Sequence, residues 1–395
     1  MPPLLGNFSK FARDYYSSMQ LTELFLQNFR NYEKIEIELK PGITGISGYN
    51  GHGKTNFLEA IHLITQGYSH RTRKVPDLLK WNTDMMVLRA QGESKKSLQK
   101  SALTLDKRGA KQVKLNSQNY KVFTKLLGSY GTLNIGPADI QLIQEGPGER
   151  RKYLDALGSQ FSATYLDVLR KYTQMTKQRN AFLKSTSSSQ NDLWESISQT
   201  FVQYGTQLII QRLKLLGQLK ENILDSYETI SSGAEELSFE FQSSIGVSYP
   251  IKATYSEDEI KQLETEIFQT FWNKLLDRKV RERDAKMSLY GPHKDDLIFL
   301  LKSKSLREFG SQGQQRSTAL ALKLAAAHKL ELEFGAPPIL LLDDIFSELD
   351  QSRRKALAKR IQSSHQVFVA SPEQQDLPFQ TTQQLNVHDG NIFYA

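Results

Sequence analysis

One glycine-rich stretch, Gly48-Tyr49-Asn50-Gly51-His52-Gly53-Lys54-Thr55, constrains this chain more than any other part of its sequence. It has the spacing of a phosphate-binding loop, in which glycines precede a Lys-Thr pair. Residues 43–47 before it predict a short buried strand, and an apolar face after it predicts a helix over residues 56–66. Glycines let backbone N–H groups close around phosphate oxygens, and the start of a helix adds its positive dipole end. The stretch therefore predicts a site for a nucleoside triphosphate.

Each residue type in this loop has an expected task. Lys54 is predicted to reach the β- and γ-phosphates, and the Thr55 hydroxyl is predicted to help hold Mg²⁺. The alternative is a glycine-rich turn followed by Lys-Thr by chance, which the strand and helix on either side disfavour. His52 fills a variable loop position and is expected to be exposed. The full set of expected nucleotide contacts here is Gly48, Tyr49, Asn50, Gly51, His52, Gly53, Lys54, Thr55 and Asn56.

A second feature lies far downstream, where the apolar run 339–342 leads into Asp343-Asp344. Such a run is typical of a central parallel strand, and an acidic residue at its end is the arrangement that holds Mg²⁺ beside a phosphate loop. Asp343 is predicted to hold the ion, directly or through water, and Asp344 to act as general base toward an attacking water. The alternative is a carboxylate pair that only caps the next turn. Most relatives of this arrangement have Glu in place of Asp344, so the shorter Asp predicts slow turnover.

A third feature, Ser311-Gln312-Gly313-Gln314, stands at the start of an apolar helix. Ser311 is a natural N-cap, and Gly313 leaves backbone N–H groups open. The simplest interpretation is an ordinary capped helix. The sharper interpretation is a second phosphate cradle; because one chain cannot easily aim two cradles at one γ-phosphate, it would act on the nucleotide of a partner.

Composition limits the partners and the compartment. The 395 residues carry a formal net charge of +8, which favours an anionic partner such as nucleic acid. No run reaches the ~18 apolar residues of a membrane helix. Cys is absent, which suits a reducing cytoplasm. Residues 1–18 lack the apolar segment of a signal peptide and are expected to form a poorly ordered extension, with Met19 as an alternative start.

The segment from His70 to Lys125 is basic and strand-like. A charged run is commonly no more than a solvated face, and that interpretation stays open. Basic residues on alternating strand positions would instead form a face that follows a phosphate backbone. The predicted DNA contacts are Arg71, Arg73, Lys107, Arg108, Lys111 and Lys114.

The order of patterns predicts an α/β fold with a helical insertion. A nucleotide-binding P-loop lobe, a mixed sheet with helices, would come from residues 19–158 and 287–395. Strands over 21–26 and 35–39 are expected to join the strand over 43–47 in one sheet. Residues 159–286 would form an inserted, mainly helical lobe without the sustained heptads of a coiled coil.

These motifs together resemble the ABC-type ATPases of the SMC-like branch, and the finer resemblance is to the RecF family of recombination mediators. The residues that carry it are the phosphate loop, the Ser311 signature, Asp343-Asp344, and the segments 26–32, 146–151, 291–297 and 347–350. The resemblance implies an ATP-dependent dimer that binds duplex DNA and single-strand/double-strand junctions at gaps. It also implies RecR and RecO as partners in loading recombinase, and weak ATP hydrolysis.

The same resemblance assigns further site residues. Arg30 and Asn31 would lie near the bound nucleotide, and Ser311, Gly313 and Gln314 would touch the γ-phosphate across the dimer. One position departs from the transporter ATPases, which place His where this chain has Ala370-Ser371.

Three other classes of protein share part of this pattern. A transporter ATPase subunit would carry that His and a helical insert that docks on a membrane partner. A nucleotide or metabolite kinase needs no Ser-x-Gly-Gln signature. A chromosome-organising SMC-like protein needs a long coiled coil.

Overall fold

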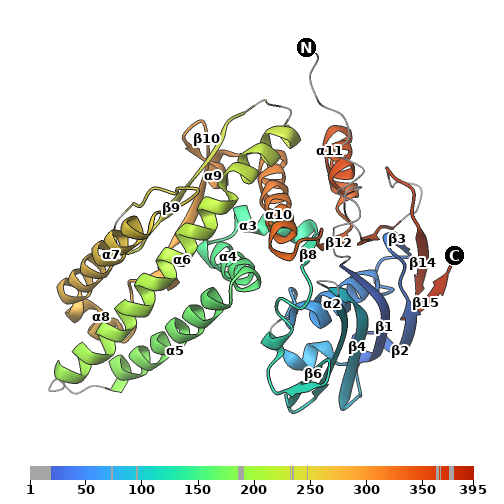
Figure 1. The fold of residues 1–395 in the computed structure, drawn as a ribbon, viewed down its shortest axis with the longest axis horizontal. Helices are drawn as coiled ribbons and strands as arrows, with labels where there is room; N and C mark the ends of the chain where they lie inside the picture. The colour runs from blue at the N-terminus through green and yellow to red at the C-terminus, as the bar shows by residue number, and fades with distance from the viewer. Residues whose placement is uncertain are drawn as a thin grey trace. The chain divides into compact units, whose positions relative to one another are not determined.

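A computed structural model describes residues 19–72, 74–94, 97–185, 191–231, 233, 235–246, 248–361, 364, 366–372 and 378–395. The predicted extension over residues 1–18, and Arg73 among the predicted DNA contacts, lie outside these ranges. The chain divides into two compact units: unit 1 takes the chain up to Ala138 and Ala326–Ala395, and unit 2 takes Asp139–Ala325. Figure 1 shows unit 1 in blue to teal for its first part and in orange to red for its second.

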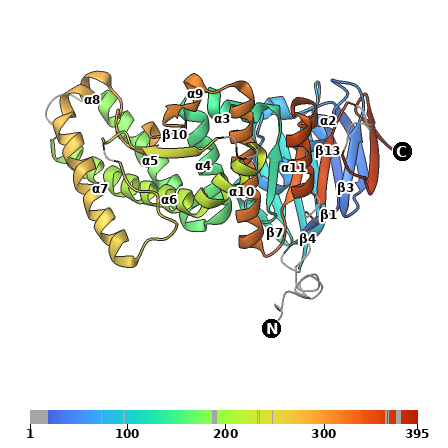
Figure 2. The same cartoon turned by 90° about the horizontal axis from the view of Figure 1, so that it is seen from above.

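The central sheet of unit 1 has the strand order β15-β14-β3-β13-β12-β8. Its strands are β3 (Gly42–Ser47), β8 (Thr132–Ile135), β12 (Ile339–Asp343), β13 (Gln366–Ala370), β14 (Gln383–His388) and β15 (Asn391–Tyr394). All neighbours pair in parallel except β14 and β15. The apolar residues of β12 are buried, as expected for a strand with parallel neighbours on both sides. Figure 2 shows β3 and β13 together in this sheet.

The second sheet of unit 1 is antiparallel and has the order β2-β1-β4-β5-β6-β7. Its strands are β1 (Gln20–Phe29), β2 (Tyr32–Glu38), β4 (Met85–Ser94), β5 (Ser97–Asp106), β6 (Lys111–Leu115) and β7 (Gln118–Tyr120). The prediction that the first three strands share one sheet is therefore wrong. Both edges of β3 are paired with strands from the other end of the chain, β13 and β14, so β1 and β2 pair elsewhere.

Helices complete unit 1. The predicted helix after the phosphate loop is α2 (Lys54–Gln66), and α11 (Gln351–Ile361) follows β12. Shorter 3₁₀ turns are η1 (Val75–Leu78), η2 (Phe123–Lys125) and η5 (Phe346–Glu348), with η3 (Pro137–Ile140) at the unit boundary. The face of α2 that carries Phe57, Leu58 and Ile61 is buried, which anchors the helix that starts at the loop.

Unit 2 is mainly helical, as predicted, but it also holds a small sheet. Its longest helices, α5 (Ala163–Ser185) and α6 (Asn191–Ser231), pack on each other. The others are α3 (Gln141–Gln144), α4 (Pro147–Phe161), α7 (Glu257–Asp277), α8 (Lys279–Ala285) and α9 (Leu306–Phe309), with η4 (Pro292–Lys294) and α10 (Gln312–Phe334), which ends in unit 1. The sheet has the order β11 (Lys304–Ser305), β10 (Asp296–Leu301), β9 (Leu237–Gln242).

The units do not begin and end where the lobes were predicted, at residues 158/159 and 286/287. The strand over 297–301 was expected in the ATPase lobe, yet β10 pairs with β9 along its whole length. This pairing keeps the chain in unit 2 until the middle of α10. At the other boundary, Arg150 of α4 forms an ion pair with Asp296 at 2.7 Å, which ties α4 to β10.

The interior of unit 2 contains ionic groups. Arg179 on α5 and Glu282 on α8 are fully buried and form an ion pair at 2.6 Å. The Arg179 guanidinium also donates to the hydroxyls of Ser198 and Ser288.

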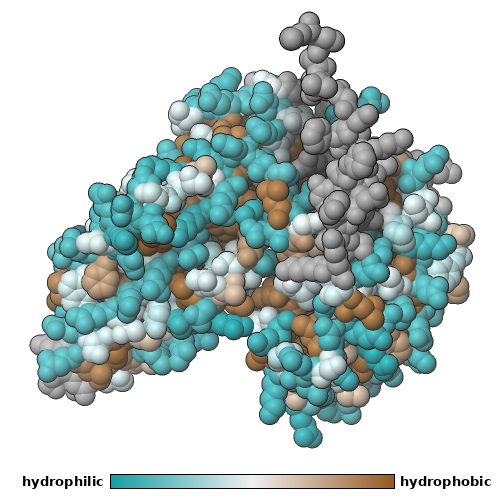
Figure 3. All heavy atoms as spheres, in the orientation of Figure 1, coloured by the Kyte–Doolittle hydropathy of each residue, from teal (hydrophilic) through white to brown (hydrophobic). Residues whose placement is uncertain are grey.

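Among the described residues no helix is both long and apolar enough to cross a membrane. On the face drawn in Figure 3, hydrophilic residues predominate and apolar ones form small groups.

Candidate nucleotide-binding site

The phosphate loop joins β3 to α2, as the sequence predicts, and two of its glycines have no room for a side chain. Gly48 has φ 143°, and a Cβ there would lie 2.2 Å from the carbonyl oxygen of Val387. Gly53 has φ 124°, and a Cβ there would lie 2.7 Å from Nδ2 of Asn31. Only glycine tolerates both the backbone conformation and these close approaches.

Lys54 is folded back into the loop that precedes it. Its ammonium donates to the carbonyl oxygens of Gly48 at 2.6 Å and Tyr49 at 3.2 Å, and to Oδ1 of Asn50 at 3.4 Å. Burial lowers the pKa of Lys54, and the nearby carboxylates of Asp344 and Asp343 oppose that shift. The cation is thus held by weak neutral acceptors, which phosphate oxygens can replace with charged ones.

Thr55 and Asp343 meet although 288 positions separate them in the sequence. The Thr55 hydroxyl donates to Oδ1 of Asp343 at 3.0 Å. Burial raises the pKa of Asp343, whereas the hydrogen bond from Thr55 opposes that rise. A hydroxyl and a carboxylate at hydrogen-bond distance form a small all-oxygen donor set, which suits Mg²⁺ bound together with substrate phosphates. The residues present therefore fit the predicted metal.

Asp344, the predicted general base, follows β12 in a left-handed conformation with φ 49°. Its backbone N–H donates to the carbonyl of Ala370 at 3.0 Å, which ties it to the end of the neighbouring strand. Ser371, in the Ala370-Ser371 pair that stands where transporter ATPases have His, donates its N–H to the carbonyl of Ile46 at 3.0 Å. The strand ends that surround the loop are thus linked through their backbones.

Asn31 and Asn56 were both expected near the nucleotide. In the structure they stabilise the loop through hydrogen bonds. Asn31 Nδ2 donates to the carbonyl of His52 at 2.8 Å, and Asn56 donates to Oδ1 of Asn31 at 2.8 Å. The Tyr32 hydroxyl, which sequence reasoning did not single out, donates to the carbonyl of Gly53 at 2.9 Å. These three side chains fix two consecutive carbonyls of the loop.

Sequence reasoning also missed Glu59, a buried carboxylate on α2 that accepts hydrogen bonds from two of the predicted site residues, Arg30 and Arg71. Arg30 donates to both of its oxygens, at 2.9 and 2.7 Å, and Arg71 donates at 3.1 Å. Ser69 adds a fourth contact at 2.5 Å. The available signal was an acidic residue within the otherwise apolar face of the predicted helix, because such a group is buried only when it is paired.

The signature residues lie in unit 2, at the start of α10, and they form a capping box. The Gln314 N–H donates to Oγ of Ser311 at 3.3 Å, and the Ser311 N–H donates to Oε1 of Gln314 at 2.6 Å. The Gln314 amide also donates to Glu235 at 2.6 Å. Ser311 is exposed and Gly313 is partly exposed. The simpler interpretation, a capped helix, is thus present in the structure, and the cradle role stays a prediction.

The predicted DNA contacts of the hairpin formed by β5 and β6 do not share one face. Lys107 forms an ion pair with Asp84 at 2.5 Å, and Arg108 is exposed in the turn. The Lys111 ammonium lies 4.8 Å from the ring centre of Phe123. Lys114 projects from the opposite side of β6, because residues of a strand alternate between its faces.

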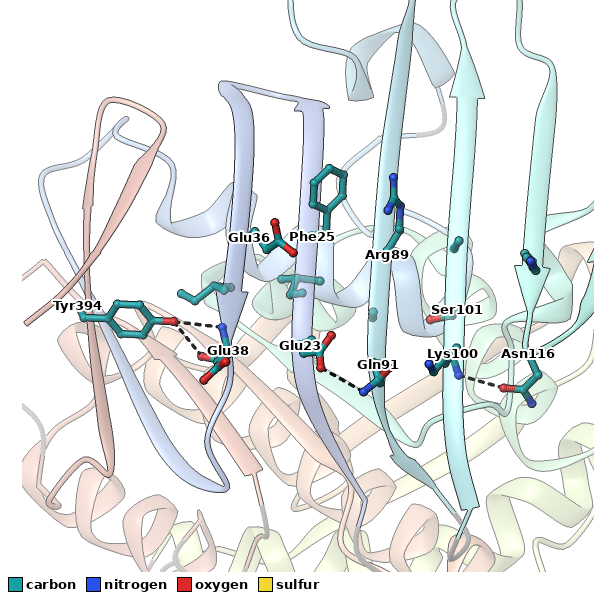
Figure 4. Close-up of a pocket in the computed structure, with 15 residues that line it drawn as sticks. Glu23, Phe25, Glu36, Glu38, Arg89, Gln91, Lys100, Ser101, Asn116 and Tyr394 are labelled. Carbon is teal, nitrogen blue, oxygen red and sulfur yellow. Dashed lines mark hydrogen bonds between the residues drawn. The ribbon is translucent and has the colours of Figure 1, made fainter.

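Lys114 lines a groove of about 950 Å³ on the outer face of the antiparallel sheet. Figure 4 shows the side chains that cross this face in register. One row runs Glu36, Phe25, Arg89, Ala102, Lys114, and the next runs Glu38, Glu23, Gln91, Lys100, Asn116. Each row begins with a carboxylate on β2 and has a Lys on β5 or β6. We call these the two charge rows; the face they form is acidic on one side and basic on the other.

The chain is similar to known proteins over most of its length. A family model described as "RecF/RecN/SMC N terminal domain" matches residues 20–387. The chain is 33% identical over 380 residues to the "DNA replication and repair protein RecF" of Bacillus thuringiensis (strain Al Hakam), covering 95% of this chain and 98% of the relative.

Solved structures agree with these sequence matches. A structure described as "the recombination mediator protein RecF-ATP in RecFOR pathway" is similar with a TM-score of 0.87 and 32% identity, over 96% of this chain and 98% of that one. An SMC head bound to the C-winged helix domain of ScpA matches with a TM-score of 0.54 at 16% identity, over 95% and 96%, which supports the shared fold alone. The resemblance stated from the motifs is confirmed, and the chain belongs to the RecF family of the RecF/RecN/SMC proteins.

Proposed function

We propose that this protein is an ATP-gated DNA-binding dimer of recombinational repair and replication maintenance. The observation that carries the proposal is the 3.0 Å contact of Thr55 with Asp343 beside the buried ammonium of Lys54. Relatives named for DNA replication and repair, and a related structure named with ATP, support it. Membership of the RecF family favours it over a transporter subunit or a chromosome-organising protein.

The residues of the loop have distinct parts in this proposal. Lys54 leaves the carbonyls of Gly48 and Tyr49 and pairs with the β- and γ-phosphates. Thr55 and Asp343 hold Mg²⁺, which when bound neutralises the charge that develops on the phosphates. Asp344 accepts a proton from the attacking water. Because Asp344 is one methylene shorter than Glu, hydrolysis is slow, and we propose that DNA stimulates it.

The signature completes the site in a second copy of the chain. Ser311, Gly313 and Gln314 meet the γ-phosphate bound by the partner, so ATP closes the dimer and ADP does not. Glu235 holds Gln314 in the structure and has to release it for this contact. The dimer binds duplex DNA and single-strand/double-strand junctions in the cytoplasm and acts with RecR and RecO.

The test separates the ATP-gated dimer from a monomeric P-loop enzyme. Ser311→Arg is expected to leave ATP binding nearly intact, because Lys54, Thr55 and Asp343 belong to the other half of the site. ATP-induced dimerisation, measured by sedimentation, and hydrolysis are both expected to disappear. Ser196→Arg, at an exposed Ser on α6, is the matched control and should dimerise normally.

A mixing experiment sharpens this test. Ser311→Arg and Lys54→Ala proteins are each expected to be inactive. A mixed dimer keeps one site with an intact loop from one chain and an intact signature from the other, so ATPase activity should recover in part. Normal dimerisation of Ser311→Arg with ATP, or no recovery on mixing, would contradict a site shared between chains.

Asp344→Asn tests the general base separately. We expect hydrolysis to fall by roughly 10²–10⁴-fold while ATP binding persists, because the amide cannot accept the proton. The ATP-bound dimer should then accumulate on DNA. A decrease of only a few-fold would make Asp344 a structural residue.

A further inference from the structure

A cluster of side chains that could hold a metal ion includes one residue of the phosphate loop and is not used by the proposed chemistry. It consists of His52 from the loop, and His388 and Asp389 from the turn between β14 and β15; we call it the loop–hairpin cluster. One ligand atom from each of the three lies within 4.8 Å of the others. Nε2 of His52 is 3.6 Å from Oδ1 of Asp389, and Nδ1 of His388 is 3.7 Å from Oδ2 of Asp389.

The two His–Asp389 separations are close to those that a small tetrahedral cation imposes, and the nitrogens of the two His lie within 4.8 Å of each other. With Zn–N and Zn–O bonds of about 2.0–2.1 Å, neighbouring ligands in a tetrahedron stand about 3.3 Å apart. Side-chain rotations that move the ligand atoms by a few tenths of an ångström bring each His nitrogen to this distance from its Asp389 oxygen, and the two His nitrogens, up to 4.8 Å apart, approach each other by a larger rotation. Imidazole with carboxylate suits Zn²⁺, and a fourth position is open to water because all three side chains reach the surface.

The backbone holds the three ligands in place before any metal binds. Asp389 and Gly390 have φ values of 46° and 73°, so they form the two-residue Asp-Gly turn typical of tight hairpins. The Gly390 N–H donates to the carbonyl of His52 at 3.1 Å, and Asn31 donates to the same carbonyl at 2.8 Å. The rings of His52 and His388 meet edge to face at 4.8 Å. Loop and hairpin are therefore already joined where the ligands converge.

We propose that His52, His388 and Asp389 form a Zn²⁺ site that fastens the phosphate loop to the C-terminal hairpin. Nδ1 of His52 has no hydrogen-bond partner within the described part of the chain. Since such a partner commonly strengthens a metal-bound His by about 10–100-fold in affinity, we expect a reversible site rather than a structural one.

The experiment uses the full chain without nucleotide and with Mg²⁺ in excess, so that Mg²⁺ competes with Zn²⁺ for the Thr55–Asp343 pair. Calorimetry is expected to show one Zn²⁺ per chain, and Co²⁺ should give the visible absorption of a tetrahedral site. Asp389→Asn keeps the turn, because Asn tolerates positive φ, and should weaken Zn²⁺ binding by about tenfold or more. His388→Ala should do the same.

His328→Ala, a change to a histidine outside the cluster, is the matched control and should bind as the wild type does. Zn²⁺ should also raise the melting midpoint of the wild type and of His328→Ala but not of His388→Ala, since a ligand stabilises only the form it binds. Saturable binding that is unchanged in both His388→Ala and Asp389→Asn would overturn the proposal. So would a wild type that binds no Zn²⁺ up to millimolar metal.

Discussion

At the scale of single residues, the loop is organised around a cation that already has partners. Lys54 is surrounded by the oxygens of Gly48, Tyr49 and Asn50. Its burial disfavours the charged form, and two carboxylates favour it. A phosphate would therefore meet an ammonium that is positioned and only weakly satisfied, which limits the entropy cost of binding.

Removing this ammonium should abolish nucleotide binding. Lys54→Ala deletes the ammonium that is proposed to pair with the β- and γ-phosphates, and fluorescent ATP titration measures the result. Lys54→Arg keeps the charge in a larger planar group, so we expect binding to survive and hydrolysis to fail. A folded Lys54→Ala protein that binds ATP as the wild type does would refute the role given to the loop.

The environment of His293 in unit 2 predicts how the stability of the protein depends on pH. Its Nε2 faces the carbonyl of Ser288 at 3.0 Å, so we infer that this nitrogen carries the proton and that Nδ1 accepts from the Tyr172 hydroxyl at 2.6 Å. Burial lowers the pKa of His293 to about 4. The unfolded chain, with an ordinary His, binds a proton more readily between about pH 6.5 and 4.

The stability contributed by neutral His293 is therefore complete above about pH 6.5 and is lost as the pH falls toward 4. Between pH 8 and 5 we expect this group to reduce the free energy of unfolding by about 2 kcal/mol. Urea unfolding at both pH values should show that difference shrinking in His293→Gln. His328→Gln is the control, and an equal pH dependence in all three proteins would contradict the assignment.

At the scale of elements, one ion pair connects helices of unit 2 that the chain separates widely. Arg179 on α5 pairs with Glu282 on α8 and donates to Ser198 on α6. Glu282 also accepts the N–H of Leu289 at 2.7 Å. A buried pair adds little net free energy, but breaking it leaves an uncompensated charge in the interior.

Arg179→Met should destabilise unit 2 by about 3–5 kcal/mol, since it leaves the buried Glu282 carboxylate without its cationic partner. Adding Glu282→Gln removes that charge and keeps an oxygen for Leu289, so the double variant should be more stable than the single one. Urea unfolding followed by tryptophan fluorescence measures both. Lys171→Met, at an exposed position of α5, should leave the midpoint unchanged; additive effects of the two buried substitutions would show that the pair is not coupled.

The helices and strands also show which parts of the fold can be predicted from the sequence. The phosphate loop with α2, and β12 with Asp343, were predictable because each depends on local spacing and apolar runs. The sheet that joins them was not, because the partners of β3 are chosen by long-range pairing. Glu59 was missed because nothing in the sequence pairs it with Arg30 and Arg71. For β9 the alternating residues 237–242 carried the signal, but it was hidden between helical segments.

At the scale of the whole molecule, the positions of the charged side chains, and not the net charge alone, determine where a DNA backbone can bind. The two charge rows place Glu23, Glu36 and Glu38 on the same face as Arg89, Lys100 and Lys114. A phosphate backbone can follow only the basic side of that face. Lys107 and Arg108 lie in the turn between β5 and β6, the two strands that carry Lys100 and Lys114.

Replacing Lys107, Arg108, Lys111 and Lys114 by Gln should weaken duplex binding about equally for all sequences. The slope of log affinity against log salt should become shallower by about one unit for each DNA phosphate that the variant no longer neutralises. Fluorescence anisotropy over a salt series measures this. The control is Lys220→Gln with Lys261→Gln in unit 2. An unaltered slope in the fourfold variant would show that these four basic residues do not contact DNA and only face solvent.

The pairing of β3 also sets the order in which this protein can be built on the ribosome. Thr44 of β3 and Gln383 of β14 are joined by a hydrogen bond although they lie 339 positions apart. At about 5–20 residues per second, β3 and its glycine loop wait on the order of 20–70 s for their strand partners to be synthesised. The proposed phosphate loop is therefore made well before the strands that fix its shape, and a nascent chain has to keep the unpaired apolar strand β3 from aggregating until β13 and β14 emerge.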